Sequence, residues 1–156
     1  MVTVTSQALS ASDSEYIGRL FHVITDLERV GDHALNILER TELAQQSEMR
    51  FSDDANKDFQ DIYEKALELL DRSIGAFVNM HLSAEEEHEL HALEDSIDHL
   101  TIAAQDAHVE RLRKKECSTS SGVLYTKLLQ DLERVGDHSY NIAWAARKDK
   151  NLIRQI

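Results

Sequence analysis

The 156-residue chain contains no proline and only five glycines. Proline interrupts helices, and glycine and proline together build the tight turns that join strands. Their scarcity permits long uninterrupted helices and argues against a sheet protein built on tight turns. Cys117 is the only cysteine. The chain therefore forms neither an internal disulfide bond nor a cysteine-based zinc site, and it suits a reducing compartment.

The chain also lacks a continuous apolar run of about 20 residues, the length that spans a bilayer. No signal peptide opens it, so we expect no insertion of this chain into a membrane. The formal net charge is −12. An acidic surface of this kind repels nucleic acid and anionic lipid, which disfavours nucleic acid as a partner. Cation binding is compatible with the same charge.

Helical periodicity is what the chain does contain, with an apolar or small side chain recurring every three or four residues. The spacing predicts helices near residues 13–45, 55–81, 84–115 and 120–148, with boundary errors of about 2–4 residues. Capping boxes are expected at Ser12 with Glu15 and at Ser83 with Glu86. The connectors are short, so successive helices should lie beside one another. The expected fold is all-α, an antiparallel bundle of four long helices.

The eight residues D-L-E-R-V-G-D-H occur twice, at 26–33 and again at 131–138. The apolar pattern continues through the glycine of this octet, which predicts a helix there and not a turn. In the first copy the expected apolar face consists of Val23, Leu27, Val30, Ala34, Ile37 and Leu38. A glycine inside a helix costs about 1 kcal/mol relative to alanine. Gly31 and Gly136 are therefore expected to mark a close approach by a neighbouring helix or a ligand.

Each copy of the octet carries two acids four residues apart, Glu28 with Asp32 and Glu133 with Asp137. Residues at this spacing share one helix face, and like charges there repel by a few tenths of a kcal/mol. Both pairs should border the apolar face. The bland interpretation is a solvated edge whose acids pair with nearby arginines or lysines. The repetition favours a bound cation or another partner.

The third predicted helix repeats the pattern, because Glu94 and Asp98 have the same flanking leucine and histidine. If the third and fourth helices pack side by side, four carboxylates meet at one seam, those of Glu94, Asp98, Glu133 and Asp137. Such a cluster suits a hard or borderline multivalent cation. We also expect four leucine and isoleucine side chains beside these acids to be buried, namely Leu27, Leu93, Ile97 and Leu132.

Other polar residues near the acids are candidates either for metal ligands or for contacts with solvent and neighbouring helices. His91, Asp95 and His99 form a row at intervals of four residues, which suits either supporting or alternative metal ligands. His33, like Arg29, is expected to turn toward solvent. The asparagines at the third position after each octet, Asn36 and Asn141, are expected to form hydrogen bonds between helices and not to bind metal.

The longer pattern D-L-E-R-V-G-D-H-x-x-N-I, at residues 26–37 and 131–142, resembles the signature of the PhoU family. The resemblance implies tandem three-helix repeats whose acidic motifs bind multinuclear clusters of iron, zinc or a similar divalent or trivalent metal. It also implies regulation of phosphate transport and not catalysis. Residues 20–36 resemble in particular the cytoplasmic domain of bacterial sodium/phosphate cotransporters. The implied partner is a membrane phosphate transporter, or a membrane domain of the same protein.

Compared with the two complete three-helix repeats that the resemblance implies, residues 1–50 correspond only to the last helix of a truncated first repeat. Residues 51–156 correspond to a complete three-helix repeat. Glu28 and Asp32 then lack partner acids within this chain. Either a second copy in a homo-oligomer supplies them, or the first helix packs against the second repeat to give four helices. In a monomer we expect Glu28 and Asp32 to bind metal weakly or not at all.

Two other function classes stay open. A ferritin-like di-iron protein needs Glu-x-x-His on each of two helices, and the chain has one such pair, Glu85 and His88. A metal-free helical scaffold is the other alternative. The sequence contains no nucleophile with an activating base, no phosphate-cradling glycine loop and no nucleotide motif. We therefore expect a protein that is not an enzyme.

Overall fold

The structure, a computed structural model, describes residues 10–147. Four helices follow one another, α1 (Ala11–Gln46), α2 (Asp53–Val78), α3 (Ala84–Arg113) and α4 (Thr119–Trp144), and these described residues contain no strand. The all-α prediction is confirmed, and the helix ends agree with the predicted ones within a few residues. The predicted end of the fourth helix at residue 148 lies outside the described residues. None of the described helices is both long and apolar enough to cross a membrane.

The helix starts show how the local sequence sets the boundaries. Ser10 is the N-cap of α1, where its side chain accepts a hydrogen bond from the Asp13 backbone and the Asp13 side chain accepts one from the Ser10 backbone. The capping box predicted at Ser12 and Glu15 is wrong, because both residues lie inside α1. The same serine-x-x-acid spacing occurs two residues earlier and starts the helix there. Ser83 is the N-cap of α3, as predicted.

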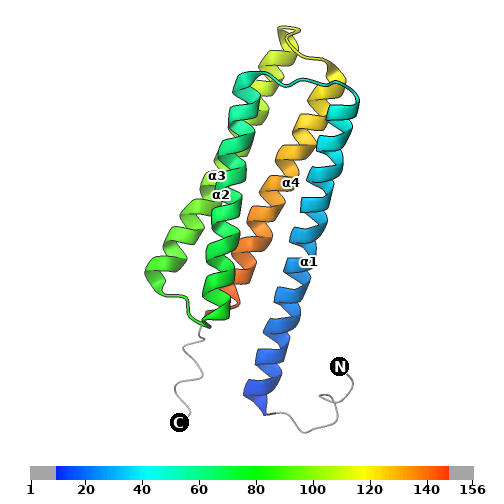
Figure 1. Cartoon of the computed structure of the whole chain (residues 1–156). Helices are drawn as coiled ribbons and strands as arrows, with labels where there is room; N and C mark the ends of the chain where they lie inside the picture. The colour runs from blue at the N-terminus through cyan, green and yellow to red at the C-terminus, as the bar shows by residue number, and fades with distance from the viewer. Residues whose placement is uncertain (1–9, 148–156) are drawn as a thin grey trace.

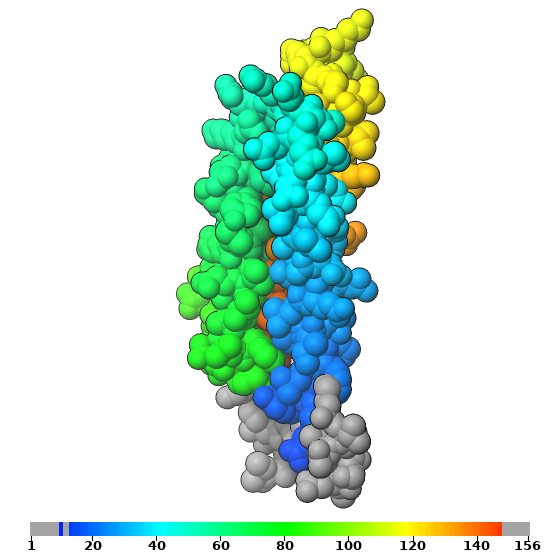
Figure 2. All heavy atoms as spheres, turned by 45° about the vertical axis from the view of Figure 1, so that its right-hand side comes forward, coloured from blue at the N-terminus to red at the C-terminus, as the bar shows by residue number. Residues whose placement is uncertain are grey.

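The helix α4 lies at the centre of the molecule. It packs against each of the other three helices, and α2 and α3 also pack against each other. Neighbours along the chain run in opposite directions (Figure 1). Among the described helices α1 packs against α4 alone, so the expectation that α1 and α2 lie in contact is wrong. The connector at residues 47–52 carries the chain over the end of α4, and orange atoms of α4 show between α1 and α2 in Figure 2.

The densest part of the core lies between α2, α3 and α4. Its completely buried side chains, each at most 1% exposed, include Ile62, Leu69, Leu90, Ile97, Leu129 and Leu132. Burial of Ile97 and Leu132 was predicted and is confirmed, and Leu93 is half-buried at the edge of this core. This three-helix unit fixes how α3 and α4 face each other, and it therefore positions the acidic side chains of both.

The predicted burial of Leu27 is wrong, since this side chain is 43% exposed. The face of α1 that contacts α4 instead carries Val23, Val30 and Ala44, which are buried at intervals of seven residues or twice seven. One partner helix covers only a narrow stripe of α1. Ile37 is half-buried beside this stripe, whereas Ala34 and Leu38 lie outside it and are exposed.

The two octet glycines differ in how closely a neighbouring helix approaches them, because α1 has fewer neighbours than α4 among the described helices. A Cβ atom built on Gly136 would lie 3.2 Å from Cδ1 of Ile97, so α3 approaches α4 closely there, as predicted. A Cβ atom built on Gly31 would meet nothing within 4 Å. The close approach by a helix that was predicted at Gly31 is therefore wrong, because no described helix covers that side of α1, and a ligand at Gly31 stays a prediction.

Candidate metal centre and the repeated octet

The two helices α3 and α4 bring three of the predicted site residues together. Glu94 and Asp98 of α3 and Asp137 of α4 each offer a carboxylate oxygen, and these oxygens lie within 4.8 Å of one another. All three residues are half-buried. Glu133 lies one turn before Asp137 on α4 and is also half-buried. We call these four residues the acidic seam; metal binding by the seam stays a prediction.

Electrostatics within the acidic seam oppose full ionisation. Burial raises the pKa of Glu94, Asp98 and Glu133 above the ordinary values of their carboxyl groups. Neighbouring carboxylates raise these pKa values further. The carboxylates of Asp98 and, to a lesser extent, Asp137 raise the pKa values of Glu94 and Glu133, and the carboxylate of Asp137 raises the pKa of Asp98. Folding therefore gathers negative charge at a place where water no longer solvates it fully.

One buried carboxylate oxygen of the seam lacks a hydrogen-bond donor in the described part of the chain. Oδ1 of Asp98 is buried and accepts no hydrogen bond from any described residue. A buried acceptor without a partner costs free energy, and a charged one costs more. A multivalent cation would coordinate this oxygen and offset the repulsion among its neighbours. The donor set of the seam therefore fits a hard or borderline metal ion.

An arginine beside the seam tests the alternative interpretation, in which the acids are neutralised by basic side chains. Nη1 of Arg134 lies 2.8 Å from Oδ2 of Asp137, and the arginine side chain is 60% exposed. Its charge lowers the pKa of Asp98 and Glu133, but less than burial and the acidic neighbours raise them. Arg134 therefore compensates Asp137 and leaves the rest of the seam under-compensated.

The row of His91, Asp95 and His99 on α3 does not form a single group of candidate metal ligands. His91, Glu94 and Asp95 form a second group whose ligand atoms lie within 4.8 Å of one another. Nδ1 of His91 lies 3.0 Å from Oδ2 of Asp95, which places this group at the outer margin of the seam. Nδ1 of His99 instead donates to the backbone oxygen of Asp95 over 2.6 Å. His91 and Asp95 are thus the members of the row that belong to a candidate ligand set, whereas His99 does not.

The acids of the first octet have different surroundings. Glu28 and Asp32 are exposed, and the ion pair that Asp32 makes is with Arg29 at 3.9 Å on the same helix. No acidic residue of another described helix joins them in a group that could hold a metal. The structure therefore does not bring these two predicted site residues into a shared cluster.

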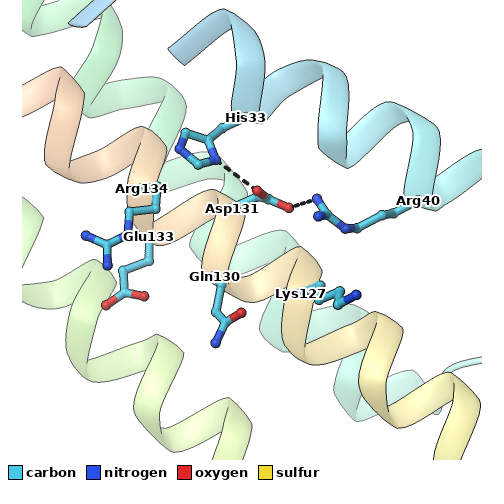
Figure 3. A pocket seen from close by; sticks show the side chains of 7 residues that line it. All are labelled: His33, Arg40, Lys127, Gln130, Asp131, Glu133 and Arg134. Atoms are coloured by element: carbon cyan, nitrogen blue, oxygen red, sulfur yellow. Dashed lines mark hydrogen bonds and ion pairs between the residues drawn. The ribbon is translucent and has the colours of Figure 1, made fainter. Parts of the chain in front are cut away.

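Asp131, the first residue of the second octet, is a buried residue that the sequence analysis missed. It is 5% exposed and accepts hydrogen bonds from Nδ1 of His33 at 2.9 Å and from Nδ2 of Asn36 at 3.3 Å. Arg40 of α1 adds an ion pair to its other oxygen (Figure 3). The hydrogen-bonding role predicted for Asn36 is confirmed. His33 is half-buried against α4, so its expected turn toward solvent is wrong.

The same contacts recur with the two octets exchanged. Asp26 accepts hydrogen bonds from Nδ1 of His138 at 2.9 Å and from Nδ2 of Asn141 at 3.5 Å. The rings of His33 and His138 stack with their centroids 5.9 Å apart. We call this reciprocal set the octet clasp; it consists of Asp26, His33, Asn36, Asp131, His138 and Asn141. It explains the repetition, because each copy of the octet is the binding partner of the other.

The helical bundle and both octets place the chain in a recognised class of all-α proteins. The model of the PhoU domain matches residues 1–41 and 59–146, and each matched segment contains one octet. The chain belongs to the PhoU family.

A curated relative shows the extent of the likeness. The chain is 29% identical over 127 residues to the Phosphate-specific transport system accessory protein PhoU homolog 1 of Thermotoga maritima. The match covers 81% of this chain and 53% of that protein, so the chain spans about half the length of this relative. No solved structure gives a significant match.

Proposed function

We propose that this chain is an accessory and regulatory domain of phosphate transport that binds a multivalent metal at the acidic seam. The observation that carries the proposal is the convergence of Glu94, Asp98 and Asp137, with a buried oxygen of Asp98 that lacks a partner. Membership of the PhoU family and the name of the Thermotoga maritima relative, a phosphate-specific transport system accessory protein, support the link to phosphate transport.

The ligands would come from two helices, Glu94 and Asp98 from α3 and Glu133 and Asp137 from α4. A divalent or trivalent cation such as zinc or iron supplies positive charge that compensates these carboxylates. Because the ligands come from both helices, metal binding and the packing of α3 on α4 are thermodynamically linked. The metal state would therefore change how firmly the bundle presents its surface to a partner.

The partner in this proposal is a membrane phosphate transporter, and the chain acts on it from the cytoplasm by protein contact. The resemblance of residues 20–36 to sodium/phosphate cotransporters favours that transporter class. Membranes that carry such a cotransporter should retain the purified chain in a sedimentation experiment, and membranes without it should not. Equal retention by both membranes would contradict this partner.

Metal binding is tested with the untagged chain, loaded separately with zinc and with ferric iron, dialysed and subjected to elemental analysis. The wild type should retain metal, and the double variant Asp98→Asn with Asp137→Asn should lose it. The matched control, Glu28→Gln with Asp32→Asn, removes the same number of charges from exposed positions and should retain metal like the wild type. Metal retention by the seam variant equal to that of the wild type would overturn the assigned site.

The ferritin-like alternative is tested with the same preparations. Aerobic loading with ferrous iron should give stable binding without repeated oxidation turnover if the seam is a regulatory site. Sustained turnover that the seam variant abolishes would favour the di-iron oxidase. No retention of any metal above that of the seam variant would favour the metal-free scaffold.

A further inference from the structure

A second candidate site lies at the end of the bundle where α1 connects to α2 and α3 connects to α4 (Figure 1). A cavity of about 220 Å³ is enclosed there by both connectors, the first turns of α2 and α4, and the last turns of α3. We call it the end cavity; its lining residues include Arg50, Ser52, His108, Arg111, Cys117 and Ser121. His108 follows Asp98 by ten residues, which places the end cavity roughly 15 Å along α3 from the acidic seam.

Two buried nitrogen atoms in the lining of the end cavity lack partners. His108 is only 5% exposed, and neither its Nε2 nor Nη2 of Arg111 forms a hydrogen bond with any described residue. The guanidinium group is charged at every physiological pH. Arg111 as a whole is half-buried, and a charge that is partly removed from water is stabilised by an opposite charge nearby. The Arg111 guanidinium lies 5.8 Å from the centre of the Tyr125 ring, and this aromatic contact helps to hold it in place.

Two helices begin at the end cavity. Ser52 is the N-cap of α2 and Ser118 that of α4, and each helix is 26 residues long. A helix N-terminus carries free backbone N–H groups and a partial positive charge, which favour a bound anion. The first turn of α4 contains no acidic residue, whereas the first turns of α1, α2 and α3 each contain at least one.

The basic side chains that line the end cavity add to the positive electrostatic potential of the helix N-termini. Arg50 and Arg111 carry two positive charges in the lining, and Glu116 is the one acid among the lining residues. This balance contrasts with the net charge of −12 of the whole chain. A second hollow, of about 350 Å³, is also lined by the basic residues Arg40, Lys127 and Arg134, but two acids, Asp131 and Glu133, line it as well. Arg40 pairs there with Asp131, and Arg134 pairs with Asp137.

We propose that the end cavity binds a small tetrahedral oxyanion, such as free phosphate or sulfate, between Arg111 and the N-terminus of α4. The cavity volume suits an ion of this size, whereas sites for larger organic ligands occupy about 300–1,000 Å³. The Arg50 guanidinium adds donors at the same opening. This site goes beyond the function proposed above and does not depend on metal at the acidic seam.

The test titrates the full untagged chain with inorganic phosphate by calorimetry at constant ionic strength, in the presence of a chelator. The chelator removes metal from the acidic seam, so that a metal-bridged phosphate there contributes nothing. We expect saturable binding of one phosphate, competition by sulfate and none by an equal ionic strength of chloride. In nuclear magnetic resonance spectra the side-chain signals of Arg111 and His108 should shift together with saturation.

Substitutions locate the anion. Arg111→Gln should weaken phosphate binding about tenfold or more, the loss expected for one charge-assisted hydrogen bond. Arg113→Gln removes the same charge from an exposed position outside the cavity lining and should leave binding within about twofold of the wild type. If Arg111→Gln fails to fold, Arg50→Gln serves in its place, since Arg50 is exposed in the connector.

Glycerol 3-phosphate distinguishes a free anion from a phosphate ester and should bind more weakly than inorganic phosphate, because esterification blocks one of the four oxygens that the donors would otherwise share. Three results would overturn the proposal: no phosphate binding beyond the chloride control, equal losses in the cavity variant and Arg113→Gln, or tighter binding of the ester. None of these outcomes bears on metal retention at the acidic seam, so the two proposals fail separately.

Discussion

The helices α1 and α4 carry the same eight residues, yet α4 packs against three helices and α1 against one. The equivalent leucines show the result, since Leu132 is 1% exposed and Leu27 is 43% exposed. The equivalent acids show it again, since Glu133 is half-buried beside α3 and Glu28 is exposed. The octet therefore specifies its pairing with the other octet, whereas a candidate metal site needs a further helix that brings its own acids.

The parts of the octet that do behave alike in both copies are the ones that face each other. Asp26 and Asp131 each accept hydrogen bonds from a histidine and an asparagine of the opposite helix. Asp131 has an additional partner, Arg40, and is the more buried of the two. Differences between the two copies can therefore be measured residue by residue, with one copy as the control for the other.

The largest difference is expected for the leucine pair. Leu132→Ala removes a completely buried side chain and should lower the free energy of unfolding by about 2–5 kcal/mol. Leu27→Ala should lower it by less than about 1 kcal/mol, because much of the removed surface already contacts solvent. Urea denaturation followed by circular dichroism measures both values. Equal losses would mean that α1 is covered as completely as α4 in solution.

The next largest difference concerns the octet clasp. Asp131→Ala leaves Arg40 and His33 without their carboxylate and should cost about 2–3 kcal/mol. This estimate lies below the cost of a fully buried ion pair because the Arg40 side chain is 26% exposed. Asp26→Ala removes hydrogen bonds to His138 and Asn141 alone and should cost about 1 kcal/mol.

Urea denaturation measures the free energy of unfolding of both clasp variants. Asp32→Ala serves as the control, because it removes an exposed acid from α1, the helix that also carries Asp26. The control should change the free energy of unfolding by less than about 0.5 kcal/mol. Equal costs at Asp26 and Asp131 would show that Arg40 contributes nothing to the clasp.

The octet glycines should respond with opposite signs. Gly31→Ala replaces an exposed helical glycine that has free space around it, and it should stabilise the protein by about 0.5–1 kcal/mol. In Gly136→Ala the new methyl group would press against Ile97 at 3.2 Å, which should cancel or reverse that gain. Stabilisation by both substitutions to the same extent would mean that α3 can move away from α4 without cost.

The helices and the acidic seam were accessible from the sequence for a physical reason. A periodicity of 3.6 residues identifies a helix without knowledge of its neighbours, and acids four residues apart must share a face. Glu94 and Asp98 border the buried Ile97, so packing of α3 on α4 suffices to aim them at α4. The metal itself, and any division into residues 1–50 and 51–156, stay predictions.

The octet clasp and the end cavity could not be found in the same way. The spacing of Asp26 to His33 and of Asp131 to His138 is seven residues, which places each pair on one face. A rule that assigns only apolar residues to helix contacts overlooks these polar pairs and favours the exposed Leu27 instead. The end cavity depends on Arg50, His108 and Ser121 from three separate elements, and only the tertiary structure brings them together.

The smallest effect distinguishes the two acidic pairs and depends on pH. With a chelator at neutral pH, Glu133→Gln should stabilise the protein by a few tenths of a kcal/mol, because it removes a carboxylate near Asp98 and Asp137. The pKa of Glu133 is raised, so the folded protein holds this proton more tightly than the unfolded chain. Wild-type stability is therefore lost as the pH rises from the ordinary glutamate pKa of about 4.3 through the raised value. The gain from Glu133→Gln should accordingly vanish as the pH falls toward that ordinary value.

The exposed Glu28→Gln is the matched control and should change the free energy of unfolding by less than the error of the urea measurement at either pH. Saturating metal turns the comparison into a test of the acidic seam. If the acidic seam binds metal as proposed, metal should stabilise the wild type through binding to the folded state, and Glu133→Gln should weaken that binding. The sign of the Glu133→Gln effect should therefore reverse, from stabilising in chelator to destabilising in metal, while Glu28→Gln stays silent in both. Stabilisation by Glu133→Gln that persists undiminished in saturating metal would show that the carboxylate repels its neighbours without serving as a ligand.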